Sequence, residues 1–136
     1  MTPRLVAPLL LALYAVVFLA PGFFIVPPLD RDEARFAQAS KQMLETGDFV
    51  AIRFNDEARN KKPAGIYWMQ AASAALFGGP VEASIWVYRI PSAVGAVLAV
   101  VFTWLAGAAL MSPRAAWMGA VLFAISVLLV TEGHIA

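Results

Sequence analysis

Two neighbouring carboxylates, Asp32 and Glu33, are the first residues in the sequence whose types and spacing suit a catalytic site. They fall in the first turn of an expected helix, next to a long hydrocarbon stretch. A carboxylate beside a region of low dielectric can act as a general base or help to hold a divalent cation. Acids in a first turn also complement the helix dipole, and Glu33 can form a capping box with Asp30. Asp32 is therefore the stronger catalytic candidate, because it is left without a structural duty.

Two lysines, Lys61 and Lys62, stand directly before Pro63 at the expected start of a second helix. Backbone N–H groups and the dipole at a helix start favour an anion, so two ammonium groups there would suit a phosphate or pyrophosphate. The alternative is that both lysines reach towards anionic lipid headgroups. Arg35, one turn after Asp32, is expected to pair with that carboxylate or to orient it.

The other polar candidates have ordinary explanations in a membrane protein. Tyr67 is a candidate for substrate contact, although Tyr67 and Trp68 are also typical of the headgroup level. Arg89 is expected to be an interfacial anchor at the head of a helix. His134 is the only histidine and the chain has no cysteine, so a tetrahedral metal site cannot be completed around it.

The elements that must position these residues are set by hydropathy. Of 136 residues, 61% are hydrophobic and the mean hydropathy is +0.74, which places the chain in the integral membrane class. Sixteen of the nineteen Asp, Glu, Lys and Arg residues lie between Asp30 and Arg89. The net charge of +1 gives no general attraction for nucleic acid, so nucleic acid is excluded as an expected partner.

Three uncharged runs are long enough to be predicted as spanning helices: Leu5–Val26, Ile90–Leu110 and Ala115–Thr131. The fold class expected is all-α and integral to the membrane, with three transmembrane helices and two juxtamembrane amphipathic helices in the first loop. A cleaved signal peptide is the alternative for the first run. The expected division is transmembrane helix 1 in 1–26, a loop in 27–89 with helices at 31–46 and 63–77, transmembrane helix 2 in 90–111, and a turn with transmembrane helix 3 in 112–136.

The polar loop is predicted to lie outside the cytoplasm. Arg4 before the first run and the acidic residues directly after it favour this orientation. Eight Lys and Arg residues within the loop argue for the opposite orientation, but the loop is about 60 residues long, the length at which that rule loses force. Between its two helices, residues Asp48–Asn60 are expected to form an extended segment, because they show no helical period.

A series of short motifs in the chain resembles a known family. The motifs are Asp32-Glu33-Ala34-Arg35-Phe36-Ala37, Met43-Leu44, Gly47-Asp48-Phe49, Lys62-Pro63, Tyr67-Trp68, Phe77-Gly78 and Arg89-Ile90-Pro91-Ser92. In this order they resemble the amino-terminal part of the polyprenyl-phosphate-dependent glycosyltransferases of the GT-C superfamily. Within that superfamily the chain looks most like the aminoarabinose transferase and protein mannosyltransferase group. The resemblance covers about the whole chain.

The resemblance implies a membrane enzyme of the plasma (inner) membrane with a polyprenyl-phosphate-linked sugar donor and a lipid A-like or protein acceptor. Asp32 would assist catalysis by activating the acceptor or through a divalent cation, with support from Glu33 and Arg35. Lys62 would approach the phosphate of the donor. Lys61 departs from the pattern, because the aminoarabinose transferases tend to have Glu at that place. The family enzymes have many more helices, so the chain is expected to be a truncated piece.

Two other classes of protein stay open from the sequence. A non-catalytic membrane subunit or anchor would use the charged loop to dock a partner or lipid headgroups. A piece of a transporter would need ionisable or helix-breaking positions inside the spanning runs. Apart from Pro21 and Pro91, near helix ends, the runs lack them.

Overall fold

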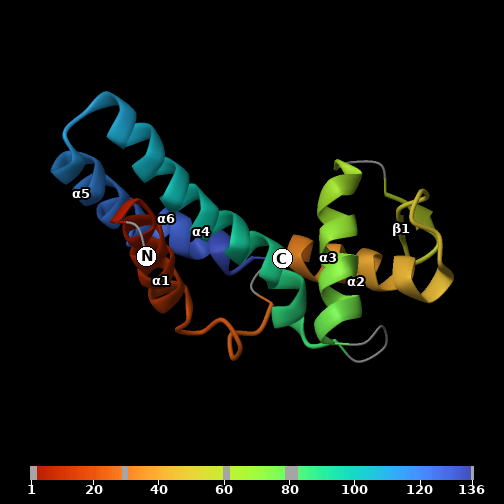
Figure 1. Ribbon diagram of the computed structural model, residues 1–136. Helices are drawn as coiled ribbons and strands as arrows, with labels where there is room; N and C mark the ends of the chain where they lie inside the picture. The colour runs from red at the N-terminus through yellow and green to blue at the C-terminus, as the bar shows by residue number, and fades with distance from the viewer. Residues whose placement is uncertain (1–2, 29–30, 60–61, 79–82, 136) are drawn as a thin grey trace. The chain divides into compact units, whose positions relative to one another are not determined.

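The computed structural model describes residues 3–28, 31–59, 62–78 and 83–135. Within these residues the chain forms helices and one short hairpin (Figure 1). In chain order they are α1 (Pro3–Leu19), α2 (Arg31–Thr46), β1 (Arg53–Phe54), β2 (Glu57–Ala58), α3 (Ala64–Phe77), α4 (Ile85–Leu110), α5 (Pro113–Ala124) and α6 (Val127–Gly133). They divide into two compact units, one of residues 1–23 and 92–134, the other of residues 24–91 with 135–136.

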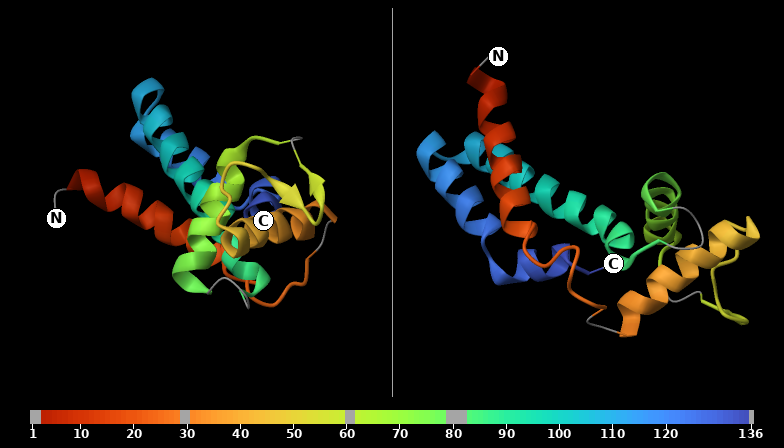
Figure 2. Two further views of the ribbon diagram at one scale, coloured as in Figure 1. Left: turned by 90° about the vertical axis from the view of Figure 1, so that its right-hand side faces the viewer. Right: turned by 90° about the horizontal axis from the view of Figure 1, so that it is seen from below.

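The first unit is built from hydrocarbon side chains. Its core consists of Leu11, Ala15, Val100, Ala120 and Ala124. Small residues allow the helices to approach closely: a Cβ added at Gly107 would lie 3.1 Å from the Cβ of Ala116. Figure 2 shows α1 beside α5, in agreement with the contacts between these helices. Dispersion and close packing therefore hold this unit together.

The prediction of three transmembrane helices is not confirmed. Among the described helices, α4 is long and apolar enough to cross a membrane, because its 26 residues include a stretch of 18 with a mean hydropathy of 2.2. Helices α5 and α6 meet the same standard only as a pair, and they are bent by 56° where they meet. The apolar part of α1, Val6–Leu19, is too short by the same standard.

Local chemistry explains why two of the predicted runs are shorter than expected. The first run ends at Leu19 and not at Val26, because Pro21 has no amide donor and Gly22 takes a left-handed conformation with φ of 83°. The third run breaks before Ser126, whose hydroxyl accepts a hydrogen bond from the Leu129 amide at 3.4 Å. A serine that caps α6 in this way ends the preceding helix.

Helix α4 is longer than predicted, because it begins at Ile85 and not at Ile90. Pro91 lies inside it and cannot donate to the carbonyl of Val87, four residues earlier. Ser73 on α3 replaces that donor, since its Oγ donates to the Val87 oxygen at 2.6 Å. The carbonyl that Pro91 leaves without a backbone donor thus forms a contact between α3 and α4.

The second unit packs α2 against α3, and both helices occupy the ranges predicted for them, 31–46 and 63–77, to within one residue. Ser40 and Met43 of α2 are buried against α3 and the hairpin segment. Ser40 Oγ donates to Gln70 Oε1 at 2.8 Å across the interface. The two cores of this unit consist of Ala37, Ala74, Val87 and Tyr88, and of Ala39, Met43, Ile52 and Tyr67.

The segment predicted as extended, Asp48–Asn60, contains the hairpin. Strands β1 and β2 are antiparallel, and Asn55 at the turn has a φ of 56°, which asparagine tolerates well. Gln42 Nε2 donates to the Asn55 carbonyl at 2.8 Å and ties the turn to α2. Asp48 Oδ1 accepts from the amides of Ala51 and Val50, both at 3.0 Å. These amides, with Ala51 the stronger, hold the pKa of Asp48 below its ordinary value of 3.8.

Candidate active site

Asp32, the predicted catalytic acid, lies between two guanidinium groups. Arg35 Nη1 is 3.4 Å from Asp32 Oδ1, which confirms the predicted pairing one turn along α2. Arg59 Nη2 approaches the same oxygen to 3.6 Å from the end of the hairpin segment. The Asp32 side chain is 52% exposed, so the carboxylate is accessible as well as paired.

Arg59 is held in place from several directions. Its Nε donates to the hydroxyl of Tyr67 at 3.0 Å, and its Cζ lies 5.3 Å from the centre of the Phe36 ring. The rings of Phe36 and Tyr67 are themselves in contact, with centroids 5.1 Å apart. A guanidinium stacked on one aromatic ring and bonded to another has little freedom to leave its position.

A pocket of about 190 Å³ opens beside the two arginines. It is lined by Arg35, Phe54, Glu57, Ala58 and Arg59. Planar guanidinium groups offer paired donors that match the oxygens of a carboxylate or phosphate. The pocket therefore combines anion-binding groups with the nearby Asp32 carboxylate, which can accept a proton.

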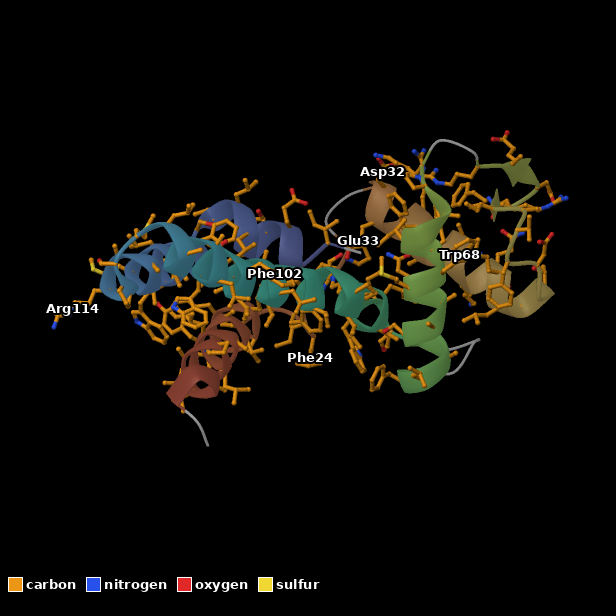
Figure 3. All side chains as sticks on the ribbon, turned by 45° about the horizontal axis from the view of Figure 1, so that its top comes forward. Phe24, Asp32, Glu33, Trp68, Phe102 and Arg114 are labelled. Carbon is orange, nitrogen blue, oxygen red and sulfur yellow. The ribbon has the colours of Figure 1, made fainter. Side chains whose placement is uncertain are left out.

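Glu33 lies on the other side of the same helical turn. Its Oε1 accepts from Arg89 Nε at 2.6 Å, and both side chains are fully buried. Arg89 also donates to the carbonyl oxygens of Val26 at 2.8 Å and Pro27 at 3.2 Å. Figure 3 shows Glu33 on the side of α2 that faces the first turns of α4, with Asp32 on the outer side.

The structure therefore changes the interpretation of two residues. Arg89, predicted as an interfacial anchor, is instead the centre of a buried ion pair that joins α2, α4 and the segment after α1. Glu33, predicted as a catalytic partner of Asp32, has its carboxylate engaged by that pair. A direct catalytic role for Glu33 stays a prediction, whereas its contacts give it the geometry of a positioning residue.

The predicted substrate-binding residues lie in different surroundings. Lys62 is exposed just before α3, and within the described part of the chain its ammonium has no ion pair. Lys61 lies outside the described residues. Tyr67 is fully buried, so only its hydroxyl, which accepts from Arg59, is directed towards the candidate site.

A divalent cation does not fit the described residues by themselves. Two guanidinium groups already surround Asp32, and no set of three His, Cys, Asp or Glu side chains in residues 3–28, 31–59, 62–78 and 83–135 could hold a metal ion. A divalent cation needs several oxygen ligands. A cation at this site therefore stays a prediction that requires further ligands.

Arg59 is the site residue that the sequence did not reveal. It falls in the segment without a helical period, 27 residues after Asp32, and no motif marks it. Alternating side chains around a turn centred on Asn55 were the only available signal for a hairpin that returns Arg59 to α2. His134, in the other unit, has both ring nitrogens near carbonyl oxygens, Val130 at 2.6 Å and Pro21 at 3.0 Å, which favours a structural role.

Comparison with known proteins identifies the family. The family model for dolichyl-phosphate-mannose-protein mannosyltransferase matches residues 9–136. An undecaprenyl phosphate-alpha-4-amino-4-deoxy-L-arabinose arabinosyl transferase of Pseudomonas savastanoi pv. phaseolicola is 35% identical over 119 residues, which cover 85% of this chain and 21% of that protein. Arabinosyl transferase 1 of Pseudomonas fluorescens, of the same description, is 34% identical over 128 residues, with 90% and 22% covered. No solved structure matches the chain.

The chain thus spans about a fifth of the length of these curated relatives. Its family and the apolar helix α4 together indicate a membrane protein. From the match over nearly its whole length, the chain belongs to the dolichyl-phosphate-mannose-protein mannosyltransferase family, within the GT-C glycosyltransferases.

Proposed function

We propose that the protein transfers a sugar from a polyprenyl-phosphate donor to an acceptor on a lipid or a protein, and that this chain supplies part of the active site. The observation that carries the proposal is the Asp32 carboxylate, half exposed and flanked by Arg35 and Arg59 beside a pocket. A proton acceptor next to anion-binding groups is what breaking a sugar–phosphate bond requires.

In the proposed reaction the acceptor hydroxyl oxygen forms a bond to the anomeric carbon on the face opposite the phosphate. The bond between that carbon and the phosphate oxygen breaks, and its electron pair leaves with the lipid phosphate. The hydroxyl proton passes to the Asp32 carboxylate. Arg35, Arg59 and Lys62 stabilise the charge that develops on the departing phosphate, since charge-assisted hydrogen bonds are the strongest available for it.

The donor class is supported by the names of the relatives and of the family. The relatives are named for undecaprenyl phosphate with 4-amino-4-deoxy-L-arabinose, and the family for dolichyl-phosphate-mannose. Both donors are long polyprenyl chains joined to a sugar through phosphate. We propose a donor of this class, a lipid A-like or protein acceptor, and a place in the plasma (inner) membrane with residues 27–89 outside the cytoplasm.

The test is a sugar-transfer assay on membranes that contain the full-length protein. We expect Asp32→Asn to lower the rate by about 100-fold or more, which is typical for loss of a general base. Lys62→Ala should lower it less, because two guanidinium groups remain. Glu45→Gln is the matched control, since Glu45 lies on the same helix, pairs with Lys41 and does not line the pocket. Wild-type rates in both Asp32→Asn and Lys62→Ala would refute the proposal.

A further inference from the structure

We infer that Arg59 is a switching residue: it holds Asp32 in the absence of the donor and transfers its contact to the donor phosphate when the donor binds. The inference rests on the proposed function and adds a coupling between donor binding and the Asp32 carboxylate. Nothing in the sequence marked Arg59, so the argument depends on its contacts in the folded chain.

One end of the Arg59 guanidinium is fixed and the other is exchangeable. Nε donates to the buried Tyr67 hydroxyl at 3.0 Å, and Cζ lies over the Phe36 ring, 5.3 Å from its centroid. Nη2 reaches Asp32 at the longer distance of 3.6 Å. The Arg59 side chain is 12% exposed, against 52% for Asp32. The tyrosine and the ring can therefore keep the guanidinium in place while Nη2 changes its partner.

A phosphate is a better partner for Nη2 than the Asp32 carboxylate is at this distance. An ion pair with a half-exposed carboxylate contributes little stability, because water screens it and competes for the same atoms. A phosphate in the adjacent pocket offers several charged oxygens to Arg35 and Arg59, including paired hydrogen bonds from one guanidinium. The donor phosphate should therefore displace Asp32 from Arg59.

The exchange makes the two substrates dependent on each other. While Arg35 and Arg59 both hold Asp32, its Oδ1 is occupied and less available to accept the proton of an acceptor hydroxyl. Donor binding removes Arg59 from that oxygen, so the carboxylate accepts the proton more readily when a donor is present. Because coupling between sites is reciprocal, removing the Asp32 carboxylate must strengthen binding of the lipid phosphate.

The buried pair on the other side of α2 does not have this property. Arg89 and Glu33 are fully buried and only 2.6 Å apart, and Arg89 also binds two backbone carbonyls. An anion from solvent cannot reach that guanidinium without unfolding the contacts around it. Exchange of partners is therefore specific to the exposed ion pairs of Asp32 with Arg35 and Arg59.

The experiment measures binding of undecaprenyl phosphate to the full-length protein in lipid nanodiscs. Asp32→Asn should tighten binding by about threefold to fivefold, the range expected when an exposed ion pair no longer competes. Arg59→Gln should weaken binding. In the Arg59→Gln background, Asp32→Asn should give less than half of its gain in the native background. Glu57→Gln, which removes the carboxylate that lines the pocket, should give the same small gain in both backgrounds.

A second measurement on the native sequence avoids dependence on the Arg59 variant. With ¹⁵N-labelled arginine, the Arg59 side-chain signal should shift on addition of undecaprenyl phosphate, and Asp32→Asn should move it part of the way without lipid. Equal gains from Asp32→Asn in both backgrounds would mean simple charge repulsion and would overturn the exchange. An Arg59 signal that does not shift on addition of undecaprenyl phosphate would also overturn the exchange. Absence of lipid binding in the wild type would instead refute the proposed donor, and the exchange with it.

Discussion

The two sides of the first turn of α2 carry neighbouring carboxylates with opposite surroundings. On the inner side, Glu33 and Arg89 are fully buried and 2.6 Å apart. On the outer side, Asp32 is 52% exposed and 3.4 to 3.6 Å from its two arginines. Adjacent residues on a helix point about 100° apart, which is enough to place one in the core and one at the surface.

The comparison separates fixed contacts from exchangeable ones. A buried ion pair is costly to break, because either partner left alone is a desolvated charge. Exposed pairs contribute little to stability and are free to change partners. We therefore propose that Glu33 and Arg89 hold α2 in place and that Asp32 takes part in catalysis. A specific substitution tests each role.

The largest effect is expected at the inner pair. Arg89→Met should lower the free energy of unfolding by about 3–5 kcal/mol, because the Glu33 carboxylate would be left buried without its guanidinium partner. Adding Glu33→Met should restore much of the loss. Denaturation of the purified protein in detergent measures both. Arg114→Met, at an exposed position, is the control and should change stability little. An Arg89→Met protein as stable as the wild type would show that the inner pair does not hold the helix.

The second effect is on rate and concerns the outer side. Asp32→Asn should reduce the turnover number for sugar transfer by about 100-fold or more and leave stability within about 1 kcal/mol of the wild type. Single-turnover transfer and denaturation on one preparation give both numbers. If the loss of activity only matched a loss of folded protein, Asp32 would stabilise the fold, as Glu33 and Arg89 do, and would not act in catalysis.

A smaller loss of stability is expected from a substitution at Ser40, on the buried face of α2. Ser40→Ala removes the donor to Gln70 in a buried contact and should cost about 1–3 kcal/mol. The comparison variant is Thr103→Ala, because the Thr103 hydroxyl is exposed and bonds only within its own helix. If both substitutions cost the same, burial of the polar contact between α2 and α3 would not be what stabilises the unit.

The smallest effect is a dependence on pH at the exposed end of the second unit. The Ala51 and Val50 amides lower the pKa of Asp48, so the folded state binds the proton less well than the unfolded state does. Stability from these contacts is present above the ordinary pKa of 3.8 and is lost as the pH falls through the lower folded value. Asp48→Asn should therefore flatten the decline of stability with acid below about pH 4. An unchanged decline would contradict it.

Local signals predicted the second unit well. The acidic first turn marked the start of α2, and Pro63 marked the start of α3. Contacts between distant segments were not predictable in the same way. Glu33 and Arg89 are 56 residues apart in sequence, and each had a plausible local explanation as a capping residue or an interfacial anchor.

The apolar unit was predicted less well, since hydropathy does not show where a helix ends. The run from Ala115 to Thr131 is uncharged throughout, yet Ser126 divides it into α5 and α6. The uncharged run placed the start of the second spanning helix at Ile90, whereas α4 begins at Ile85. Pro91 lies within α4, and Ser73 satisfies the carbonyl that this proline leaves unpaired. A local cap at Ser126 decided the first outcome, and a partner from another helix, Ser73 on α3, decided the second.

The central claim is that Asp32 acts on the substrate whereas Glu33 acts on the fold. The most direct measurement is a comparison of Asp32→Asn and Glu33→Gln, with the free energy of unfolding and the single-turnover transfer rate determined on the same samples. We predict a stable, inactive Asp32→Asn protein and a destabilised Glu33→Gln protein whose remaining folded fraction still transfers sugar. A stable but inactive Glu33→Gln protein beside an active Asp32→Asn protein would contradict the claim.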